Sequence, residues 1–298
     1  MKKYLLNIFL FAATGLTISS CTETKLSSES VIKPEEKQQT PFDKWLQVNY
    51  VEPYNIEFIW RYDDKETDHN YYNIPADYNA AIKLAHIVKY TCIEAYDRVA
   101  GINFTRQYFP KMLYATGEFQ YNNNNTMILG TAEGGKKIYL AGTNNLDKFL
   151  GSIDDLNTYY LKTIHHEFMH ILNQTKPYDT AYDLITGTTY LSDDWSTSTG
   201  ASGYLKRGYI SAYSQKEGRE DIAEILSTYV TNPKSWWDAK MTEAGTEGAT
   251  LIQKKLDIVR SYMKTEWNVD IDELRDEILR RENNIINGSV SLTDLSIN

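Results

Sequence analysis

The sequence predicts an α+β fold, with a small mixed sheet in the first half of the folded part and a mostly helical C-terminal part. Strand-like and helix-like segments are mixed at first, whereas the pattern from about Glu217 onward is almost entirely helical. No internal repeat is present, and the order of segments fits a doubly wound sheet poorly. The apolar fraction of 42% and the charged fraction of 24% are typical of a globular protein.

The N-terminal segment predicts export. A positive start, "MKK", precedes the apolar run "YLLNIFLFAATGLTI", which is too short and too early for a stable spanning helix. The run ends in "ISSC", which resembles the bacterial lipobox and implies a lipoprotein lipidated at Cys21; an ordinary signal peptide with a chance cysteine is the alternative. We therefore divide the chain into a signal peptide (1–20), a polar flexible tether (21–40) and a domain (41–298) with subdomains 41–155 and 156–298.

Three segments of the first subdomain have clear local signals. Residues 54–64, "YNIEFIWRYDD", alternate enough to predict a strand. Residues 75–101 show helical spacing, a helical start and a terminal glycine, and place Cys92 as a buried thiol within the helix. Residues 125–142, "NTMILGTAEGGKKIYLAG", predict two strands joined by a glycine turn.

The stretch "TIHHEFMHILNQ" (163–174) carries the pattern H-E-x-x-H as His166, Glu167 and His170. On a helix the two histidines lie about 40° apart, one turn from each other, as ligands of a single zinc ion must. Apolar residues occupy the opposite side, so this helix has a core-facing back, while Glu167 on the flank could reach a metal-bound water. His165 points away and is interpreted as structural or supporting. The alternative is a solvent-facing polar stripe.

The third ligand must be a carboxylate if it follows this helix, because no histidine or cysteine occurs after His170. The extended metzincin pattern is excluded, since Asn173 and Lys176 stand where it needs glycine and histidine. The downstream candidates are Asp179, Asp183, Asp193, Asp194, Glu217, Glu220, Asp221 and Glu224.

A second amphipathic helix is predicted from "AYSQKEGREDIAEILSTYV" (212–230). We interpret "SQKE" as a capping box, with Ser214 as N-cap and Glu217 three positions on. Glu220 and Glu224 then share the side opposite the apolar face, where one carboxylate could bind zinc and another could orient an imidazole. Asp221 directly follows Glu220 and could compete for the metal.

The segment "YSQKEGREDIAE" resembles the second half of the gluzincin site in the anthrax lethal factor family, where a tyrosine precedes a helix of the form E-x-x-A-E. This resemblance implies Glu220 as the third zinc ligand, Glu224 as its supporting carboxylate and Tyr213 as a catalytic phenol. With its lipobox and "HHEFMHILNQ", the chain also resembles the zinc metallohydrolase lipoproteins of Bacteroides-type bacteria that accompany nutrient importers. That resemblance implies a zincin-like metalloprotease fold and an outer-membrane lipoprotein beside a TonB-dependent importer.

Together these features predict one zinc ion per chain and hydrolysis of a peptide or related amide bond, with Glu167 as general base. The amide could instead belong to a modified sugar or a peptidoglycan stem. A non-catalytic peptide- or glycan-binding lipoprotein is the main alternative, with "SDDW" and "KSWWD" as candidate contacts. A structural zinc site is less favoured, because it needs four protein ligands. The net charge of −9 and the lack of a lysine and arginine cluster argue against a nucleic-acid-binding surface.

Overall fold

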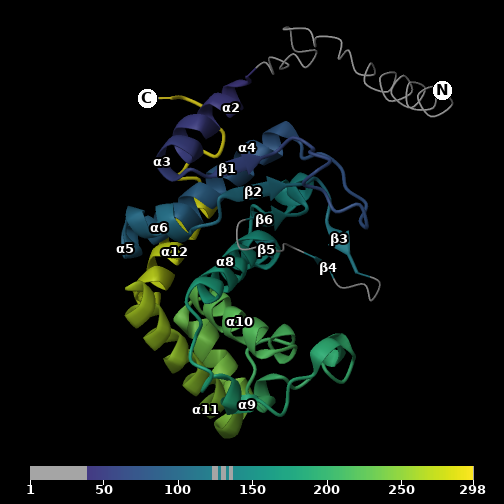
Figure 1. Ribbon diagram of the computed structural model, residues 1–298, viewed down its shortest axis with the longest axis vertical. Coiled ribbons are helices and arrows are strands. Elements are labelled where there is room, and N and C mark those ends of the chain that lie inside the picture. The colour runs from purple at the N-terminus through teal and green to yellow at the C-terminus, as the bar shows by residue number, and fades with distance from the viewer. Residues whose placement is uncertain (1–38, 123–126, 129–131, 134–136, 298) are drawn as a thin grey trace, which may run out of the picture. The chain divides into compact units, whose positions relative to one another are not determined.

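The computed structural model describes residues 39–122, 127–128, 132–133 and 137–297. The predicted signal peptide, Cys21 and nearly all of the predicted tether lie outside these residues. Within them, no helix is both long enough and apolar enough to cross a membrane. The α+β class is confirmed, with helices as the main component (Figure 1).

The first half combines a small sheet with helices. Its helical segments are α2 (Pro41–Leu46), η1 (Gln47–Val51), α3 (Glu52–Tyr54), α4 (Tyr78–Val88), η2 (Lys89–Ile93), α5 (Glu94–Ala100), α6 (Ile102–Tyr108) and η3 (Thr143–Lys148). The predicted helix over 75–101 is confirmed: Asp77 caps it, accepting from the amides of Asn79 and Ala80, and Gly101 ends it with a φ of 86°. A π-helical turn, η2, interrupts it and contains the buried Cys92.

The sheet is mixed, as predicted. Its strands run in the order β1 (Glu57–Ile59), β2 (Met112–Ala115), β6 (Lys137–Leu140) and β5 (Ala132–Glu133). The first three are parallel, and β5 pairs antiparallel with β6. The strand predicted over 54–64 is only three residues long, because the chain turns after Trp60, where Arg61 binds Asp43 of α2 (Nη1–Oδ1, 2.6 Å).

The hairpin predicted over 125–142 is confirmed where β5 pairs antiparallel with β6. Its first strand is divided, however, because β4 (Met127–Ile128) pairs with β3 (Gln120–Tyr121) in a second, two-stranded sheet. Alternation of residue types predicts extended backbone, but it leaves open which strand supplies the hydrogen bonds. The glycine turn at 134–135 lies outside the described residues.

The C-terminal part is helical, as predicted. Its helical segments are α7 (Ile153–Leu156), η4 (Asn157–Leu161), α8 (Lys162–Thr175), α9 (Asp183–Thr186), η5 (Ser192–Ser196), η6 (Leu205–Arg207), η7 (Tyr213–Gln215), α10 (Gly218–Val230), α11 (Lys234–Trp267) and α12 (Ile271–Ile286). Helices α8 and α10 pack against each other, and α11 and α12 pack on α10 (Figure 1).

The capping box predicted at Ser214–Glu217 is wrong. Helix α10 begins later, at Gly218, and the side chain of its N-cap residue Glu217 makes no capping hydrogen bond. Residues Tyr213–Gln215 instead form the 3₁₀ turn η7, because the Ser214 amide donates to Ser211 Oγ (3.0 Å). The buried Gln215 side chain fixes this turn by donating to the carbonyl of Gly200 (2.8 Å).

Candidate metal centre

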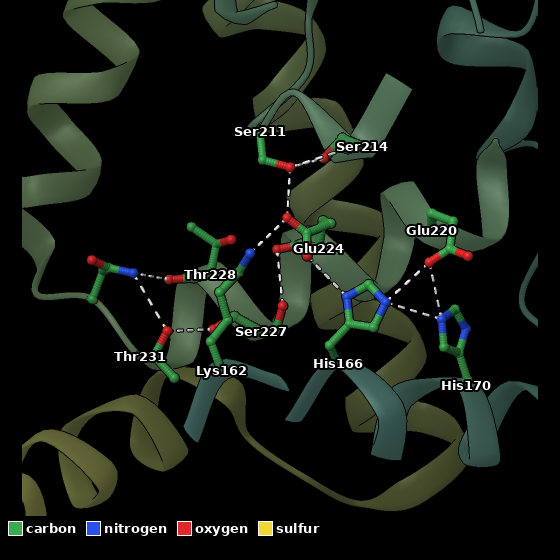
Figure 2. Close-up of polar contacts among 11 residues, drawn as sticks. Lys162, His166, His170, Ser211, Ser214, Glu220, Glu224, Ser227, Thr228 and Thr231 are labelled. Carbon is green, nitrogen blue, oxygen red and sulfur yellow. Dashed lines mark hydrogen bonds and ion pairs between the residues drawn. The ribbon is translucent and has the colours of Figure 1, made fainter. Parts of the chain in front are cut away.

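Three side chains converge between α8 and α10. His166 Nε2 lies 3.0 Å from His170 Nε2 and 3.0 Å from Glu220 Oε2, and His170 Nε2 lies 3.2 Å from the same oxygen. Figure 2 shows both imidazoles directed at the Glu220 carboxylate. In the described part of the chain, no other group of three histidine, cysteine or acidic residues is arranged to hold a metal ion.

Helix α8 can present its two histidines because its other side is anchored in the core. The predicted apolar positions Leu161, Ile164, Phe168, Ile171 and Leu172 are all buried. Phe168 lies edge-on to Tyr96, with ring centroids 5.0 Å apart, and 5.0 Å from the ring of Phe109. This aromatic packing fixes the rotation of α8 about its axis, and therefore the direction of His166 and His170.

His165 belongs to that core and not to the metal-binding face. Its Nδ1 lies 3.3 Å from the Tyr96 hydroxyl, and its Nε2 lies 3.8 Å from Cys92 Sγ. Burial lowers the pKa of His165 to about 3, so its imidazole is neutral at pH 7. The residue therefore packs α8 against the helix that carries Cys92.

Helix α10 contributes two carboxylates, one turn apart. Glu220 faces the two histidines, and Glu224 Oε1 accepts a hydrogen bond from His166 Nδ1 (2.9 Å). Asp221, the competing candidate, faces another way: its Oδ2 lies 2.6 Å from Lys255 Nζ, and both side chains are fully buried. Asp221 is thus engaged by α11, while Glu220 is available to a metal.

The charges of these groups act strongly on one another. Burial alone would lower the pKa of His166, but the carboxylates of Glu220 and Glu224 raise it to about 9. Burial alone would raise the pKa of Glu220, but hydrogen bonds and charge from His166 and His170 hold it well below its usual range. The Glu220 carboxyl is therefore ionised at neutral pH, as a metal ligand must be.

The donor set fits zinc. Two imidazole nitrogens and one carboxylate oxygen form the His₂Glu type found in catalytic zinc sites. An ion about 2.0–2.1 Å from each donor would require donor atoms a little more than 3 Å apart, close to the separations of 3.0–3.2 Å observed. These three residues would hold the ion and leave a fourth position open.

Glu167 directly follows His166 and is buried, with 8% of its surface exposed. After burial and the larger effects of Glu220 and Glu224, its negative charge also raises the pKa of both His166 and Tyr213. No hydrogen bond from the described residues engages this carboxylate. It can therefore accept a proton from a water between these groups.

Tyr213 lies on the turn η7, with its ring centroid 5.9 Å from that of His166. Trp195 packs edge-on against it (4.9 Å), and Lys216 Nζ lies 3.5 Å from its hydroxyl. Burial and the charge of Glu220 raise the pKa of Tyr213 well above its usual range. The phenol therefore stays protonated at neutral pH and can donate a hydrogen bond.

A cavity of about 750 Å³ adjoins the metal-binding atoms. It is lined by His170, Asn173, Gln174, Pro177, Tyr178, Thr180, Asp183, Glu217, Arg219 and Glu220. Almost all of these side chains are polar. The amide oxygen and nitrogen of Asn173 are buried and have no hydrogen-bond partner among the described residues. The volume lies in the range of small-molecule and peptide side-chain sites.

The remaining candidates lie outside the ligand cluster. Asp183 accepts from the Tyr178 hydroxyl (2.9 Å) in the wall of the cavity, and Asp179 Oδ1 accepts from the Ala181 amide. In "KSWWD", Trp237 is buried against Tyr229 (5.0 Å between ring centroids). In "SDDW", Trp195 supports Tyr213. These tryptophans serve packing in the folded chain.

Sequence reasoning missed two residues of the site. Lys162 Nζ and Ser211 Oγ both donate to Glu224 Oε2, at 2.6 and 2.5 Å (Figure 2). The position of Lys162 in the sequence could have indicated its role, because it lies one turn before His166 and therefore on the same side of the helix. Ser211 lies in an irregular segment, and no local pattern points to it.

Comparisons with known proteins agree with this geometry. A family model described as "Putative zinc-binding metallo-peptidase" matches residues 35–272. Among solved structures, the chain is similar to a "putative zinc-binding metallo-peptidase" from Bacteroides caccae ATCC 43185, with 38% identity and a TM-score of 0.74, over 90% of this chain and 100% of the other. No curated protein matches.

Proposed function

The chain belongs to this family of zinc-binding metallopeptidases, and from that premise we propose that it is a gluzincin-type peptidase with one zinc ion per chain. We assign the ion to His166, His170 and Glu220. The observation that carries the assignment is the convergence of their three donor atoms within 3.2 Å of one another. The predicted zincin-like fold and lethal factor-like site form part of this proposal.

The chemistry proposed for the residues follows from their positions. Zinc held by His166, His170 and Glu220 would supply a Lewis acid that lowers the pKa of a coordinated water and polarises the carbonyl of the scissile bond. Glu167 takes a proton from the attacking water and delivers it to the leaving amine. Tyr213 donates a hydrogen bond to the oxyanion that develops at the carbonyl.

We propose that the substrate is a peptide whose polar side chain occupies the cavity beside His170 and Glu220. The unpartnered amide of Asn173 and the polar side chains of the lining support a substrate group that forms hydrogen bonds there. An amide in a modified sugar or a peptidoglycan stem has the same reactive bond. Turnover of defined peptides beside such compounds would separate these substrate classes.

We further propose, on the lipobox and the whole-chain resemblance alone, that the protein is an outer-membrane lipoprotein anchored through Cys21. Its periplasmic or surface orientation and its association with a TonB-dependent nutrient importer belong to the same proposal. Labelling of cells with a lipid precursor, comparing the wild type with Cys21→Ala, tests the anchor. Wild-type protein that takes up no label would contradict it.

The metal assignment is tested by the zinc content of the purified wild type beside Glu220→Ala. We expect about one zinc ion per wild-type chain and a large loss in the variant, because two imidazoles alone hold zinc weakly. Glu247→Ala, which removes an exposed glutamate of α11, should keep its zinc and serves as the control. Zinc retained by Glu220→Ala would move the third ligand elsewhere, and a wild type that binds none after reconstitution would overturn the proposal.

The catalytic assignment is tested separately with Glu167→Gln, which keeps the shape of the side chain but removes its basicity. We expect zinc to stay bound while kcat for peptide cleavage falls by roughly 10²–10⁴-fold. Full activity in this variant would remove Glu167 from the mechanism. A wild type that binds zinc and peptides but cleaves no amide would favour the binding-lipoprotein alternative.

A further inference from the structure

We propose that Lys162 and Ser211 are positioning residues of the metal centre, which hold Glu224 so that His166 presents Nε2 to the zinc ion. The inference rests on the proposed function in one respect, namely that zinc binds at His166 Nε2. It adds two residues to the site that neither the H-E-x-x-H pattern nor the E-x-x-A-E pattern contains.

The two oxygens of Glu224 have separate partners. Oε1 accepts from His166 Nδ1 at 2.9 Å, whereas Oε2 accepts from Lys162 Nζ at 2.6 Å and from Ser211 Oγ at 2.5 Å. Figure 2 shows the carboxylate enclosed between these three groups. Only 4% of Glu224 is exposed, so in the folded chain its carboxylate is satisfied mainly by these three donors.

Because Oε1 and Oε2 of Glu224 have different partners, Oε1 remains available to His166 and controls which ring nitrogen carries the proton. When the ring is neutral, as a zinc ligand must be, a hydrogen bond from Nδ1–H to a carboxylate selects the tautomer in which Nε2 carries the lone pair, and it also fixes the orientation of the ring. If Oε2 lost both donors, the buried carboxylate would gain by rotating or shifting to satisfy that oxygen. The donors on Oε2 therefore keep Oε1 on His166.

The charge of Lys162 also offsets that of the neighbouring carboxylates. Glu224 and Glu167 are buried, Glu220 lies beside them half-buried, and the Lys162 ammonium is paired directly with Glu224. An ionised carboxylate is costly to bury unless it is paired and hydrogen-bonded. Lys162 thus lets Glu224 stay in place before the metal arrives, so the ligands need less rearrangement on binding.

Ser211 connects Glu224 to the turn that carries Tyr213, the proposed catalytic phenol. Its hydroxyl oxygen accepts from the Ser214 amide (3.0 Å), within the turn η7 that carries Tyr213. One carboxylate therefore joins α8, α10 and this turn. A change at Ser211 should alter the position of Tyr213 as well as that of His166.

The test is zinc affinity, measured with a competing chelator on the purified full chain for the wild type, Lys162→Met, Lys162→Arg and Ser211→Ala. We expect Lys162→Met to weaken zinc binding about 10- to 100-fold and Ser211→Ala by less, with Lys162→Arg recovering most of the loss. The visible absorption of the Co²⁺-substituted protein should shift in the two weakened variants, because it reports the coordination of the ion. Lys234→Met, which breaks an exposed ion pair with Asp238, is the matched control.

The outcomes separate the two proposals. Wild-type zinc affinity and an unchanged cobalt spectrum in Lys162→Met and Ser211→Ala would overturn the positioning role while leaving the zinc site intact. A wild type without zinc would instead overturn the proposed function. If Lys162→Met fails to fold, Ser211→Ala decides alone, and an unchanged zinc affinity and spectrum in that variant would count against the proposal.

Discussion

Tyr213 and Glu167, the two proposed catalytic residues, belong to different elements. Trp195 packs edge-on against Tyr213 and Lys216 Nζ lies 5.4 Å from the centre of its ring, so the phenol has a defined position without belonging to the proposed ligand set. Glu167 lies on α8, one residue after His166. We assign proton transfer to Glu167 and oxyanion stabilisation to Tyr213. Either residue can be replaced without removing a proposed zinc ligand.

Replacing Tyr213 with phenylalanine tests that separation. The variant keeps the ring that packs on Trp195 but loses the hydrogen-bond donor, so we expect kcat to fall about 10²–10³-fold while zinc content and KM change little. Steady-state kinetics with one peptide substrate and metal analysis of the same sample provide the measurement. Tyr72→Phe, at a tyrosine that is 80% exposed, is the control. A kcat equal to that of the wild type would show that the Tyr213 hydroxyl takes no part in the reaction and that the residue only packs against its neighbours.

At the scale of single residues, the sequence predicted those parts of the site whose residues are close together in the chain. His166 and His170 lie one turn apart on a helix, so helical geometry alone brings them together. The choice of Glu220 over Asp221 needed a resemblance, because both lie on the same turn of α10. The bond from Lys162 to Glu224 crosses 62 positions of the chain, and no local pattern encodes it.

At the scale of elements, α10 is held between α8 and α11 by polar contacts on opposite sides. Towards α8 it presents Glu220 and Glu224, and towards α11 it presents Asp221. Lys255 of α11 also donates to the Gly208 carbonyl (2.9 Å). The same buried ammonium therefore links α10, α11 and the segment before η7.

Removing one partner of the buried Asp221–Lys255 ion pair should destabilise the folded chain. In Lys255→Met, Asp221 would remain buried without its cation, and we expect a loss of roughly 3–5 kcal/mol in the free energy of unfolding. The double variant Asp221→Asn/Lys255→Met should recover a large part, because it buries no unpaired charge. Urea unfolding followed by circular dichroism measures both. A single variant as stable as the wild type would show that the pair does not stabilise the packing of α10 on α11.

The helices themselves were predictable because their apolar periodicity is long and their ends carry local signals, as at Asp77 and Gly101. The boundary of α10 was not. "SQKE" has the composition of a capping box, but the buried side chain of Gln215 and the bond to Ser211 stabilise a separate turn. Tertiary hydrogen bonds outweighed a local preference that is small by comparison.

At the scale of the whole molecule, the sheet shows what a single sequence leaves undetermined. Strand β1 pairs with β2 across more than fifty residues, Glu57 facing Met112, and parallel pairing gives no short-range turn signal. The α+β class followed from the order of segments, but the strand order did not. The division into subdomains at residue 155 stays a prediction.

The stability of the molecule should also depend on pH through Glu282, which is fully buried on α12. Burial raises the pKa of its carboxyl from 4.5 to about 8, although Asn157 Nδ2 donates to its Oε2 (3.3 Å). Between these two pH values the folded chain therefore holds a proton that the unfolded chain has released. The resulting stabilisation is fully present below about pH 4.5 and is lost as the pH rises through about 8.

In Glu282→Gln no proton is released from this position on unfolding, because the amide does not titrate. Between pH 5 and 8 we expect the free energy of unfolding of the wild type to fall, relative to the variant, by up to about 1.4 kcal/mol per pH unit. Denaturant unfolding at several pH values, with zinc chelated throughout, gives both curves. Glu273→Gln, at an exposed position of the same helix, should keep the wild-type slope. Parallel curves for Glu282→Gln and wild type would mean that Glu282 is ionised in the folded protein, in which case its buried carboxylate must have a cationic or hydrogen-bonding partner beyond Asn157.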